Sequence, residues 1–543
     1  MNALWIMCDQ LRFDYLSCTG HPSLKTPHID ALAARGVRFD RAYVQSPICG
    51  PSRMSAYTGR YCRSHGSTWN GFPMRIGEPT LGDHLRKIGV RSVLVGKTHM
   101  IADTEGMEWL GIDPGSTIGV NHAECGFEPY IRDDGIHPDG PLHDPDLQYN
   151  RYLREQGFEA ENPWEDWANA TEGSDGEMLS GWLMRYNNLP ARVPDEHSET
   201  PYMTRKAMEF MEGAGDQPWL CHLSLIKPHW PYVVPAPYND MYGQDDIQPV
   251  IRDENERDPD RAHPVFKAFQ DSRICKGFVD EKVRQAIIPA YMGLIKQIDD
   301  QMGKLFAWME ERGMMEDTMI IFSSDHGDYL GDHWMGEKDQ FHDVSARVPL
   351  IIYDPRAEAD ATRGQVRDEL VEYIDLAPTF IDVFGGKPLP HILEGRSLTR
   401  LLHDPAPAEK WRRYAISEYD YSTRYARIAL DVAPDDARMV MVCDKHWKYI
   451  FAEGFRPMLF DLENDPHELN DLGADPAHED VRARMYEALC FWSRQFHTRI
   501  TVPAELVERN SNVEVPGVYI GVWDEADFEE HFHRPFSERP ASG

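Results

Sequence analysis

Four short apolar runs in this chain end in polar, chemically capable side chains, and this repeated pattern constrains the fold most. The runs are NALWIMCD (2–9), VRSVLVGKTHM (90–100), PWLCHLSLIKPHW (218–230) and DTMIIFSSDHGD (317–328). Each is short and partly β-branched, as is typical of a buried strand. Helical patterns lie between them, such as HIDALAARGVRF, TLGDHLRKIG, TRKAMEFMEGAG and AYMGLIKQIDDQMGKLFAWMEERG. Strands alternating with helices predict an α/β fold with a large, mostly parallel central sheet flanked by helices.

The 543 residues divide into three predicted regions. Residues 1–390 are expected to form the main α/β domain, with weakly periodic insertions at about 103–200 and 239–280 near the mouth of a pocket. Hairpin-like strands and an amphipathic helix predict a smaller α+β domain over 391–500. The tail, 501–543, is too apolar for a free segment, so we expect it to contact another subunit of a homo-oligomer.

Composition excludes several classes of protein. The net charge of −34, from 90 acidic and 56 basic residues, disfavours binding to nucleic acid or to an anionic membrane. No run approaches the roughly 18 to 20 apolar residues of a membrane span, and the N-terminus lacks a signal-peptide pattern, so we expect a cytoplasmic protein. The nine cysteines are scattered without paired CxxC spacing, which argues against a disulfide framework or a zinc cluster.

Two pairs of candidate metal ligands follow predicted strands. Asp9 and Gln10 end the first run, and Asp325 and His326 end the last. One strand-end aspartate is more often a turn former than a ligand. Two such pairs together favour a divalent ion, because a parallel sheet brings distant strand ends side by side.

A set of cationic or imidazole side chains accompanies these pairs. Its members are Arg53, Lys97, His99, His229 and Lys338. Taken singly, each is more simply a solvated surface charge or a buried structural histidine. Together, beside a metal, they suit a substrate whose charge lies on non-bridging oxygens, such as a sulfate or phosphate ester.

Cys49 lies in the turn-forming stretch SPICGPSRMSAYTGRY (46–61). Its run C-G-P-S-R, followed by T-G-R, resembles the C-x-P-S-R signature of type I sulfatases, within the alkaline phosphatase superfamily. Further segments are similar to that family from residue 4 to about residue 473. They are MCDQLRFD, GKTHM, SSDHGDYLGDH, GEKDQFHDVSARVPLII, HWKYI and LFDLENDPHELNDL.

The resemblance implies an alkaline-phosphatase-like fold and a specific chemistry. A formylglycine-generating enzyme would oxidise Cys49 to Cα-formylglycine, whose hydrate carries two hydroxyls on one carbon. One hydroxyl attacks the ester to form a covalent sulfo-enzyme; the other loses its proton, and collapse to the aldehyde expels sulfate. An ordinary serine or thiol nucleophile would leave an intermediate that needs a second, equally difficult hydrolysis.

The resemblance also assigns a role to each matching residue. The implied metal ligands are Asp9, Gln10, Cys49, Asp325 and His326. Lys97, His99, His229 and Lys338 resemble groups that bind sulfate oxygens and protonate the leaving group, with His229 or Lys338 as the acid. Arg53 fits a role in holding the hydrate. Asn70 lies where the phosphonate-hydrolase branch places a polar substrate-side residue.

Departures from the usual sulfatase pattern keep alternatives open. The metal pairs here are Asp-Gln and Asp-His instead of Asp-Asp and Asp-Asn, as in phosphonate monoester hydrolases and choline sulfatases. A nitrogen ligand moves the preference from Ca²⁺ toward Mn²⁺, and both remain candidates. The retained Lys97 and His99 favour an arylsulfatase-like enzyme over the alternative, a phosphonate monoester hydrolase or phosphodiesterase.

Two further hypotheses remain. A choline sulfatase would need an aromatic or acidic cage, for which Trp69, Trp230 and Tyr232 are candidates. A different class of protein, a non-catalytic anion-binding protein, would keep Cys49 as a thiol. Relatives with similar tails suggest a tetramer.

Overall fold

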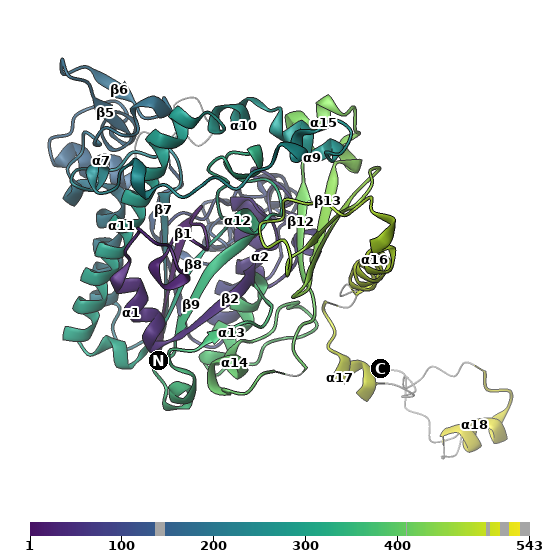
Figure 1. The fold of residues 1–543 in the computed structure, drawn as a ribbon. Helices are drawn as coiled ribbons and strands as arrows, with labels where there is room; N and C mark the ends of the chain where they lie inside the picture. The colour runs from purple at the N-terminus through teal and green to yellow at the C-terminus, as the bar shows by residue number, and fades with distance from the viewer. Residues whose placement is uncertain (136–146, 409, 496–499, 511–520, 533–543) are drawn as a thin grey trace. The chain divides into compact units, whose positions relative to one another are not determined.

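A nine-stranded sheet forms the centre of the molecule (Figure 1). The computed structural model describes the whole chain except residues 136–146, 409, 496–499, 511–520 and 533–543. The strands are β1 (Asn2–Asp9), β2 (Val37–Tyr43), β3 (Arg91–Gly96), β4 (Glu128–Arg132), β7 (Trp219–Pro228), β8 (Thr318–Ser324), β9 (Arg347–Tyr353), β10 (Val366–Arg367) and β11 (Val371–Glu372). Their order is β10-β2-β9-β8-β1-β7-β3-β4, with β11 beside β2. Only β9 runs antiparallel to its neighbours, so the predicted mostly parallel sheet is confirmed.

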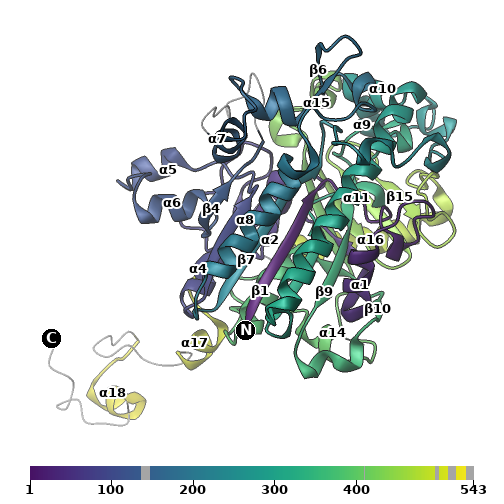
Figure 2. The same cartoon turned by 90° about the vertical axis from the view of Figure 1, so that its left-hand side faces the viewer.

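Helices cover both faces of this sheet (Figure 2). One face packs against α1 (Pro27–Arg35), α8 (Glu199–Gly213) and α11 (Glu281–Glu311). The other packs against α2 (Cys49–Thr58), α4 (Leu81–Arg86) and α13 (Leu376–Val383). Side chains of β1 alternate between the two cores: Leu4, Ile6 and Cys8 face one, and Ala3, Trp5 and Met7 face the other. A central strand covered on both sides must be apolar along its buried length, as the run ALWIMC (3–8) is.

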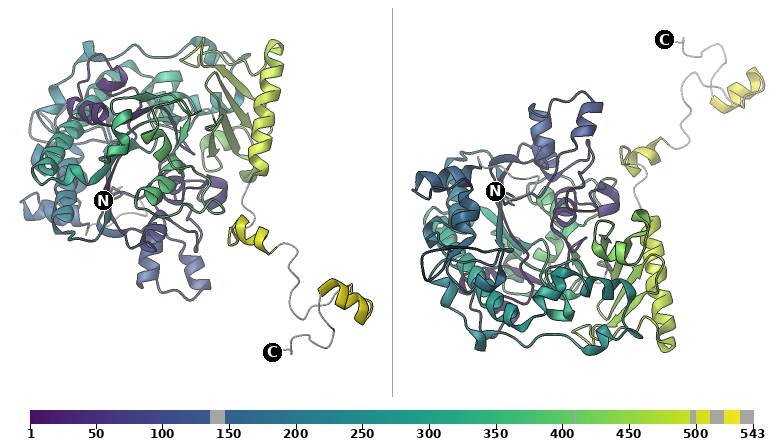
Figure 3. Two further views of the ribbon diagram at one scale, coloured as in Figure 1. Left: turned by 90° about the horizontal axis from the view of Figure 1, so that it is seen from below. Right: turned by 90° about the horizontal axis from the view of Figure 1, so that it is seen from above.

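The C-terminal sheet is smaller and antiparallel, as predicted. It has the order β12-β13-β14-β15. Its strands are β12 (Ala415–Asp420), β13 (Arg438–Cys443), β14 (Trp447–Ala452) and β15 (Met458–Asp461). The amphipathic helix α16 (Glu479–Arg494) packs along β13 and β14 (Figure 3). This sheet belongs to one compact unit, Met1–Pro388 with Leu393–Phe496, so a domain boundary near residue 390 remains a prediction.

The two segments expected as insertions carry mainly short elements. Residues 103–200 contain α5 (Thr104–Trp109), α6 (Thr117–Ala123), α7 (Gln148–Glu155) and the hairpin of β5 (Ala170–Glu172) with β6 (Met178–Ser180). They also supply β4, which pairs with β3 at the edge of the large sheet. Residues 239–280 contain α9 (Pro264–Gln270) and α10 (Arg273–Phe278).

The remaining short helices are α3 (Cys62–His65), α12 (Asp343–Ala346), α14 (Thr399–His403) and α15 (Tyr425–Ala429). A second unit, Leu389–Ile392 with His497–Gly543, carries α17 (Ala504–Arg509) and α18 (Glu525–Phe532). The predicted subunit contact of residues 501–543 lies partly outside the described residues and remains a prediction. Within the described part of the chain, every helix is too short or too polar to cross a bilayer.

Candidate active site

The four strands predicted to end in functional side chains are consecutive neighbours in the sheet, in the order β8-β1-β7-β3. All four run parallel, so their carboxyl ends lie at one edge. Cys8 pairs with Ser324, which places Asp9 and Gln10 beside Asp325 and His326. His229 follows β7 and Lys97 follows β3. The two distant pairs of candidate ligands are therefore adjacent.

Cys49 begins helix α2 and is fully buried against these strand ends. Its Sγ lies 3.1 Å from Nε2 of His326 and 3.7 Å from Oδ1 of Asp9. Ligand atoms of Asp9, Cys49, Asp325 and His326 all lie within 4.8 Å of one another. Nδ1 of His326 donates to the carbonyl oxygen of Gly327 at 2.8 Å, so Nε2 points to the cluster and would offer its lone pair to an ion when the ring is neutral. Two carboxylates and an oriented imidazole fit a divalent ion.

Gln10 adopts a left-handed backbone conformation, with φ of 68°. Its backbone N–H donates to Oδ1 of Asp325 at 3.1 Å, which ties the two strand ends together. Its side-chain Oε1 accepts from Nζ of Lys338 at 3.2 Å, so this oxygen faces the same cluster. The side-chain Nε2 donates to Asp328 and to the hydroxyl of Tyr232. The amide is thus fixed with its oxygen toward Cys49.

Buried cations balance the two carboxylates. Nε of Arg53 lies 2.7 Å from Asp325, and Nη2 lies 3.1 Å from Asp9. Nζ of Lys97 lies 2.6 Å from Oδ2 of Asp9. Burial raises the pKa of Asp9, but Lys97 and Arg53 help to outweigh it and hold the pKa below its ordinary value. Among the described residues, the contacts of Arg53 are with Asp9, Asp325, Ser224 and the Lys97 carbonyl, so its structural role is to hold the carboxylates.

Lys338 and His229 form a hydrogen-bonded pair at the nucleophile. Nζ of Lys338 lies 3.2 Å from Sγ of Cys49 and 3.1 Å from Nε2 of His229. Nδ1 of His229 lies 2.7 Å from the Trp230 carbonyl and must donate to it, so Nε2 accepts from Lys338. Burial and Lys338 lower the pKa of His229 to about 3. His229 is therefore neutral and Lys338 is the cation of the pair.

The same cations also change the pKa of the Cys49 thiol. Burial raises the pKa of Cys49, but Lys338 and Lys97 outweigh burial and hold it well below the ordinary value for a thiol. Burial lowers the pKa of His326, but the negative charges of Asp325 and Cys49 raise it to about 9. The cations around residue 49 thus stabilise a negative charge on its side chain or on a group bound to it.

Asn70 and His99 lie in loops beside this centre. Oδ1 of Asn70 accepts from the backbone N–H of Gly50 at 2.7 Å, which fixes the first turn of α2. His99 has φ of 56°, and Asp134 holds its backbone N–H at 2.8 Å. The imidazole Nδ1 of His99 is buried without a hydrogen-bond partner among the described residues. Asn70 therefore contacts α2, whereas His99, within the described part of the chain, forms no hydrogen bond to Cys49.

Sequence reasoning missed several supporting residues. Asp328 accepts from Gln10 and from the hydroxyl of Tyr232, which orients the Gln10 amide. Glu337, next to Lys338, accepts from Nε1 of Trp230 at 2.8 Å. Asp328 follows His326 by two residues in SSDHGD, so its place after a strand was a usable signal. The pairing of Glu337 with Trp230 joins segments 107 residues apart and leaves no local pattern.

Two of the three proposed cage residues line one cavity. Trp230 and Tyr232, with Trp182 and Phe278, border a cavity of about 490 Å³ that also meets Glu337. Trp69 instead lies beneath the guanidinium of Arg424, whose Cζ is 4.8 Å from the ring centroid. Trp69 therefore does not line the cavity that Trp230 and Tyr232 border, so the three aromatic side chains do not form one cage.

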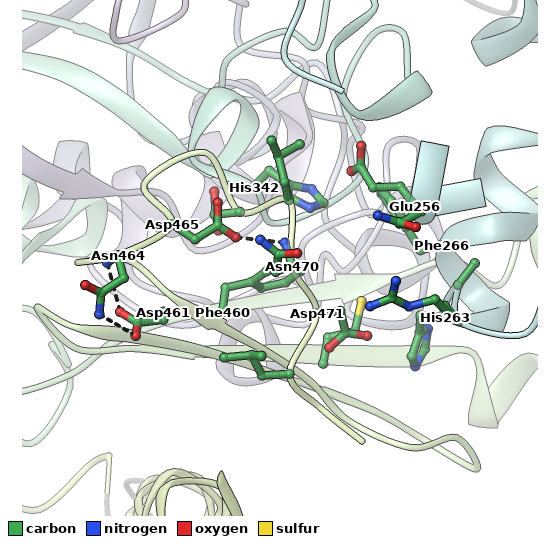
Figure 4. A pocket seen from close by; sticks show the side chains of 17 residues that line it. Glu256, His263, Phe266, His342, Phe460, Asp461, Asn464, Asp465, Asn470 and Asp471 are labelled. Carbon is green, nitrogen blue, oxygen red and sulfur yellow. Dashed lines mark hydrogen bonds between the residues drawn. The ribbon is translucent and has the colours of Figure 1, made fainter. Parts of the chain in front are cut away.

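A separate pocket of about 340 Å³ lies between residues 255–266 and the loop 461–472 (Figure 4). A second group of metal-ligand types, Glu256, His333 and His342, lies beside it. Its polar atoms are already paired: Nδ1 of His333 lies 2.7 Å from Glu256, and Nδ1 of His342 lies 2.8 Å from the Tyr329 hydroxyl. The two imidazoles stack with centroids 3.9 Å apart. Hydrogen bonding and packing account for this group.

The comparisons with known proteins identify this sheet and the cluster at its edge as those of a hydrolase of the alkaline phosphatase superfamily. Residues 1–386 match the sulfatase family model, and residues 331–495 match the N-sulphoglucosamine sulphohydrolase C-terminal model. The chain therefore belongs to the sulfatase family, which confirms the family predicted from its motifs.

The named relatives of this chain differ in activity. The chain is 32% identical over 497 residues to the multifunctional alkaline phosphatase superfamily protein PehA of Trinickia caryophylli, covering 88% of this chain and 92% of that one. It is 27% identical to an arylsulfatase of Clostridium perfringens, covering 87% and 90% of the two chains. Among solved structures, a phosphonate monoester hydrolase from Silicibacter pomeroyi aligns with a TM-score of 0.79 at 28% identity, covering 92% and 96%.

Proposed function

We propose that this protein hydrolyses sulfate monoesters, as an arylsulfatase-like enzyme, with one divalent ion, Ca²⁺ or Mn²⁺, and with Cys49 converted to formylglycine. The observation that carries the proposal is the convergence on Cys49 of three metal-ligand side chains and Lys338. In such a hydrolase, the nucleophile, the cations that stabilise the transferred group and the proton donor all lie next to one another.

Asp9, Gln10, Asp325 and His326 would hold the ion, together with residue 49. When bound, the ion supplies a positive charge that favours an ionised nucleophile and a polarised ester oxygen. Formylglycine, once hydrated, supplies one hydroxyl for attack and a second whose deprotonation releases the inorganic product. A formylglycine-generating enzyme is the partner that this chemistry requires.

The chain's own cations act on the transferred group and the leaving group. Lys97 places an ammonium group at Asp9 and Lys338 places one at Cys49, where ester oxygens would be bound. Lys338 is the charged member of its pair with neutral His229, so it holds the proton that a departing oxygen needs. Aryl oxides need little protonation, whereas alkoxides need a full proton.

A second candidate activity is hydrolysis of phosphonate monoesters or phosphodiesters. The similarity to a phosphonate monoester hydrolase over nearly the whole chain supports it. A choline sulfatase is the third candidate, with the aromatic cavity beside Glu337 as its support. All three would act on a small-molecule ester at the same cluster, and we propose that a homo-oligomer, a tetramer, is the working form.

Peptide mass spectrometry tests whether the protein is an enzyme of this kind at all. Conversion of Cys49 replaces its SH and one hydrogen by an oxygen, a loss of mass confined to one peptide. Unconverted thiol, after co-expression with a formylglycine-generating enzyme, would favour the non-catalytic anion-binding protein.

Kinetics on aryl sulfate, phenyl phosphonate and choline sulfate, with Ca²⁺ or Mn²⁺ supplied, rank the activities. Cys49→Ala should abolish turnover of every ester. We expect Lys97→Ala and His99→Ala to lower sulfate turnover more than phosphonate turnover. Phosphonate turnover far above sulfate turnover in the unaltered protein would reverse the ranking.

A further inference from the structure

The turn that carries Lys338 has an unusual backbone. Glu337 and Asp339, on either side of Lys338, have φ of 64° and 95°, a region that side chains other than glycine rarely adopt. Such a conformation persists only when its surroundings hold it. Because Lys338 Nζ must stay 3.2 Å from Cys49, whatever holds this turn also holds the lysine at the nucleophile.

Each neighbour of Lys338 is anchored by a different segment. Glu337 accepts from Nε1 of Trp230, whose ring packs on His229 with centroids 4.2 Å apart. Oδ2 of Asp339 forms an ion pair with Nη2 of Arg424 at 2.5 Å, and the two side chains are 8% and 24% exposed. The first anchor lies in the segment that directly follows β7 of the large sheet. The second comes from the connection between β12 and β13 of the C-terminal sheet.

Arg424 also contacts the loop that carries Trp69 and Asn70. Its guanidinium lies over Trp69, and the next residue, Asn70, accepts the N–H of Gly50 at 2.7 Å. One arginine therefore braces both the turn of Lys338 and the loop that fixes the first turn of α2.

We propose that Arg424 is a positioning residue: its ion pair with Asp339 and its stacking on Trp69 hold Lys338 at residue 49. This inference rests on the proposed function. The inference extends the proposed function, because it makes the connection between β12 and β13 necessary for protonation of the leaving group.

The mechanism of the effect is competition for Lys338. Oδ1 of Asp339 has no hydrogen-bond partner among the described residues, so the carboxylate depends on Arg424 for its compensation. Removal of the guanidinium would leave the buried carboxylate of Asp339 without its cation, which is costly, and Lys338 is the adjacent residue in the chain. We infer that Lys338 would then turn toward Asp339 and away from Cys49.

The kinetic test uses a series of aryl sulfates whose leaving phenols differ in pKa. We expect Arg424→Gln to lower kcat/KM about tenfold or more for the poorest leaving group and only a few-fold for 4-nitrophenyl sulfate, since a general acid matters most for basic leaving groups. Arg424→Lys should recover part of the loss. The double variant Arg424→Gln/Asp339→Asn should have a higher kcat/KM for the poorest leaving group than Arg424→Gln alone, because the carboxylate that attracts Lys338 is gone.

Arg456→Gln is the matched control. Arg456 forms a partly buried ion pair with Asp471 at 2.6 Å in the same C-terminal region. We expect this variant to leave the dependence on the leaving group unchanged. An equal loss for all leaving groups in Arg424→Gln, or no recovery in the double variant, would overturn the proposal.

A crystal structure of Arg424→Gln separates the two proposals. A displaced Lys338 Nζ supports the positioning role, and an Nζ still within 3.5 Å of residue 49 overturns it, whichever ester the enzyme hydrolyses. Failure of the unaltered protein to hydrolyse any of the esters would count against the proposed function alone.

Discussion

At the scale of single residues, the site depends on compensation of buried charge. Asp9, Asp325 and Arg53 are all fully buried, and each carboxylate has a guanidinium nitrogen within 3.1 Å. Taking one member away leaves the others unpaired in a region that water does not reach. The charges are therefore interdependent, and a substitution of one affects the whole group.

Arg53→Ala should destabilise the protein by about 3–5 kcal/mol when metal is removed with a chelator, because two buried carboxylates lose their partner. The measurement is urea unfolding with and without chelator. Arg86→Ala is the control: Arg86 is 48% exposed and pairs with Asp83, so we expect less than about 1 kcal/mol. Equal effects from the two substitutions would contradict this account.

Buried His222 should make the fold sensitive to acid. It stacks on Trp5 and bonds the hydroxyl of Tyr57, and burial lowers its pKa to about 3. The unfolded chain protonates this imidazole near pH 6.5, so the unfolded state binds more protons as pH falls from about 6.5 to about 3. Stability should therefore fall toward acid, by about 1.4 kcal/mol per pH unit for this group.

His222→Gln should flatten the loss of unfolding free energy between pH 6.5 and 5, measured by urea titration. His446→Gln is the control, because the side chain of His446 is 60% exposed. A slope that stays the same in His222→Gln would show that the histidine is not the source.

At the scale of elements, the close packing of strand ends sets where the functional side chains lie. Gly96 ends β3 with φ of 115°, and an added Cβ would lie 2.0 Å from the Ser224 carbonyl oxygen of β7. The N–H of Lys97 donates to that same oxygen at 3.1 Å. Only a glycine lets β3 approach β7 closely enough to bring Lys97 to Asp9.

Gly96→Ala should therefore cost about 4 kcal/mol or more, since it adds a steric clash to an unfavourable φ. Gly89→Ala is the matched substitution, with φ of 78° and open space at its Cβ, and should cost only about 1–2 kcal/mol. Thermal unfolding of the two variants measures the difference. A Gly96→Ala protein as stable as Gly89→Ala would show that β3 can shift freely.

The elements were predictable to different degrees. The runs that form β1, β3, β7 and β8 are mainly apolar because both faces of the sheet are covered, so their composition identifies them. The sequence EPYIR of β4, an edge strand with exposed Glu128 and Pro129, lacks that pattern and falls within the segment 103–200 that is expected as an insertion. Strand order was not predictable, because it depends on pairing between distant segments.

The residues of the site were also predictable to different degrees. Asp9, Asp325 and Cys49 lie directly in recognisable motifs, and the structure brings them together. Arg424 and Asp339 are 85 positions apart in sequence, and no local spacing announces their ion pair. Supporting contacts of this kind arise from tertiary packing and become visible only in three dimensions.

At the scale of the whole molecule, a net charge of −34 surrounds the proposed site for an anionic ester. The overall field would repel such a substrate at long range, while Lys97, Lys338 and a bound ion would attract it at short range. Screening by salt weakens the long-range term most, because the Debye length falls to about 8 Å at physiological ionic strength.

We therefore expect kcat/KM for an anionic aryl sulfate to rise as ionic strength increases from about 0.01 M to 0.15 M. Choline sulfate, which carries no net charge, serves as the comparison and should change little. Steady-state kinetics at constant pH and metal concentration measure both. A fall in kcat/KM for the aryl sulfate would show that local attraction controls the approach of the substrate.

The four adjacent strand ends also bear on how such an enzyme can be redesigned. The proposed ligands Asp9, Gln10, Asp325 and His326 lie at strand ends of the large sheet, to which the described parts of residues 103–200 and 239–280 contribute only the edge strand β4. Exchange of these two segments, apart from β4, with those of a relative should alter which organic group is accepted. The machinery beneath would stay in register, because none of its ligands belongs to the exchanged parts.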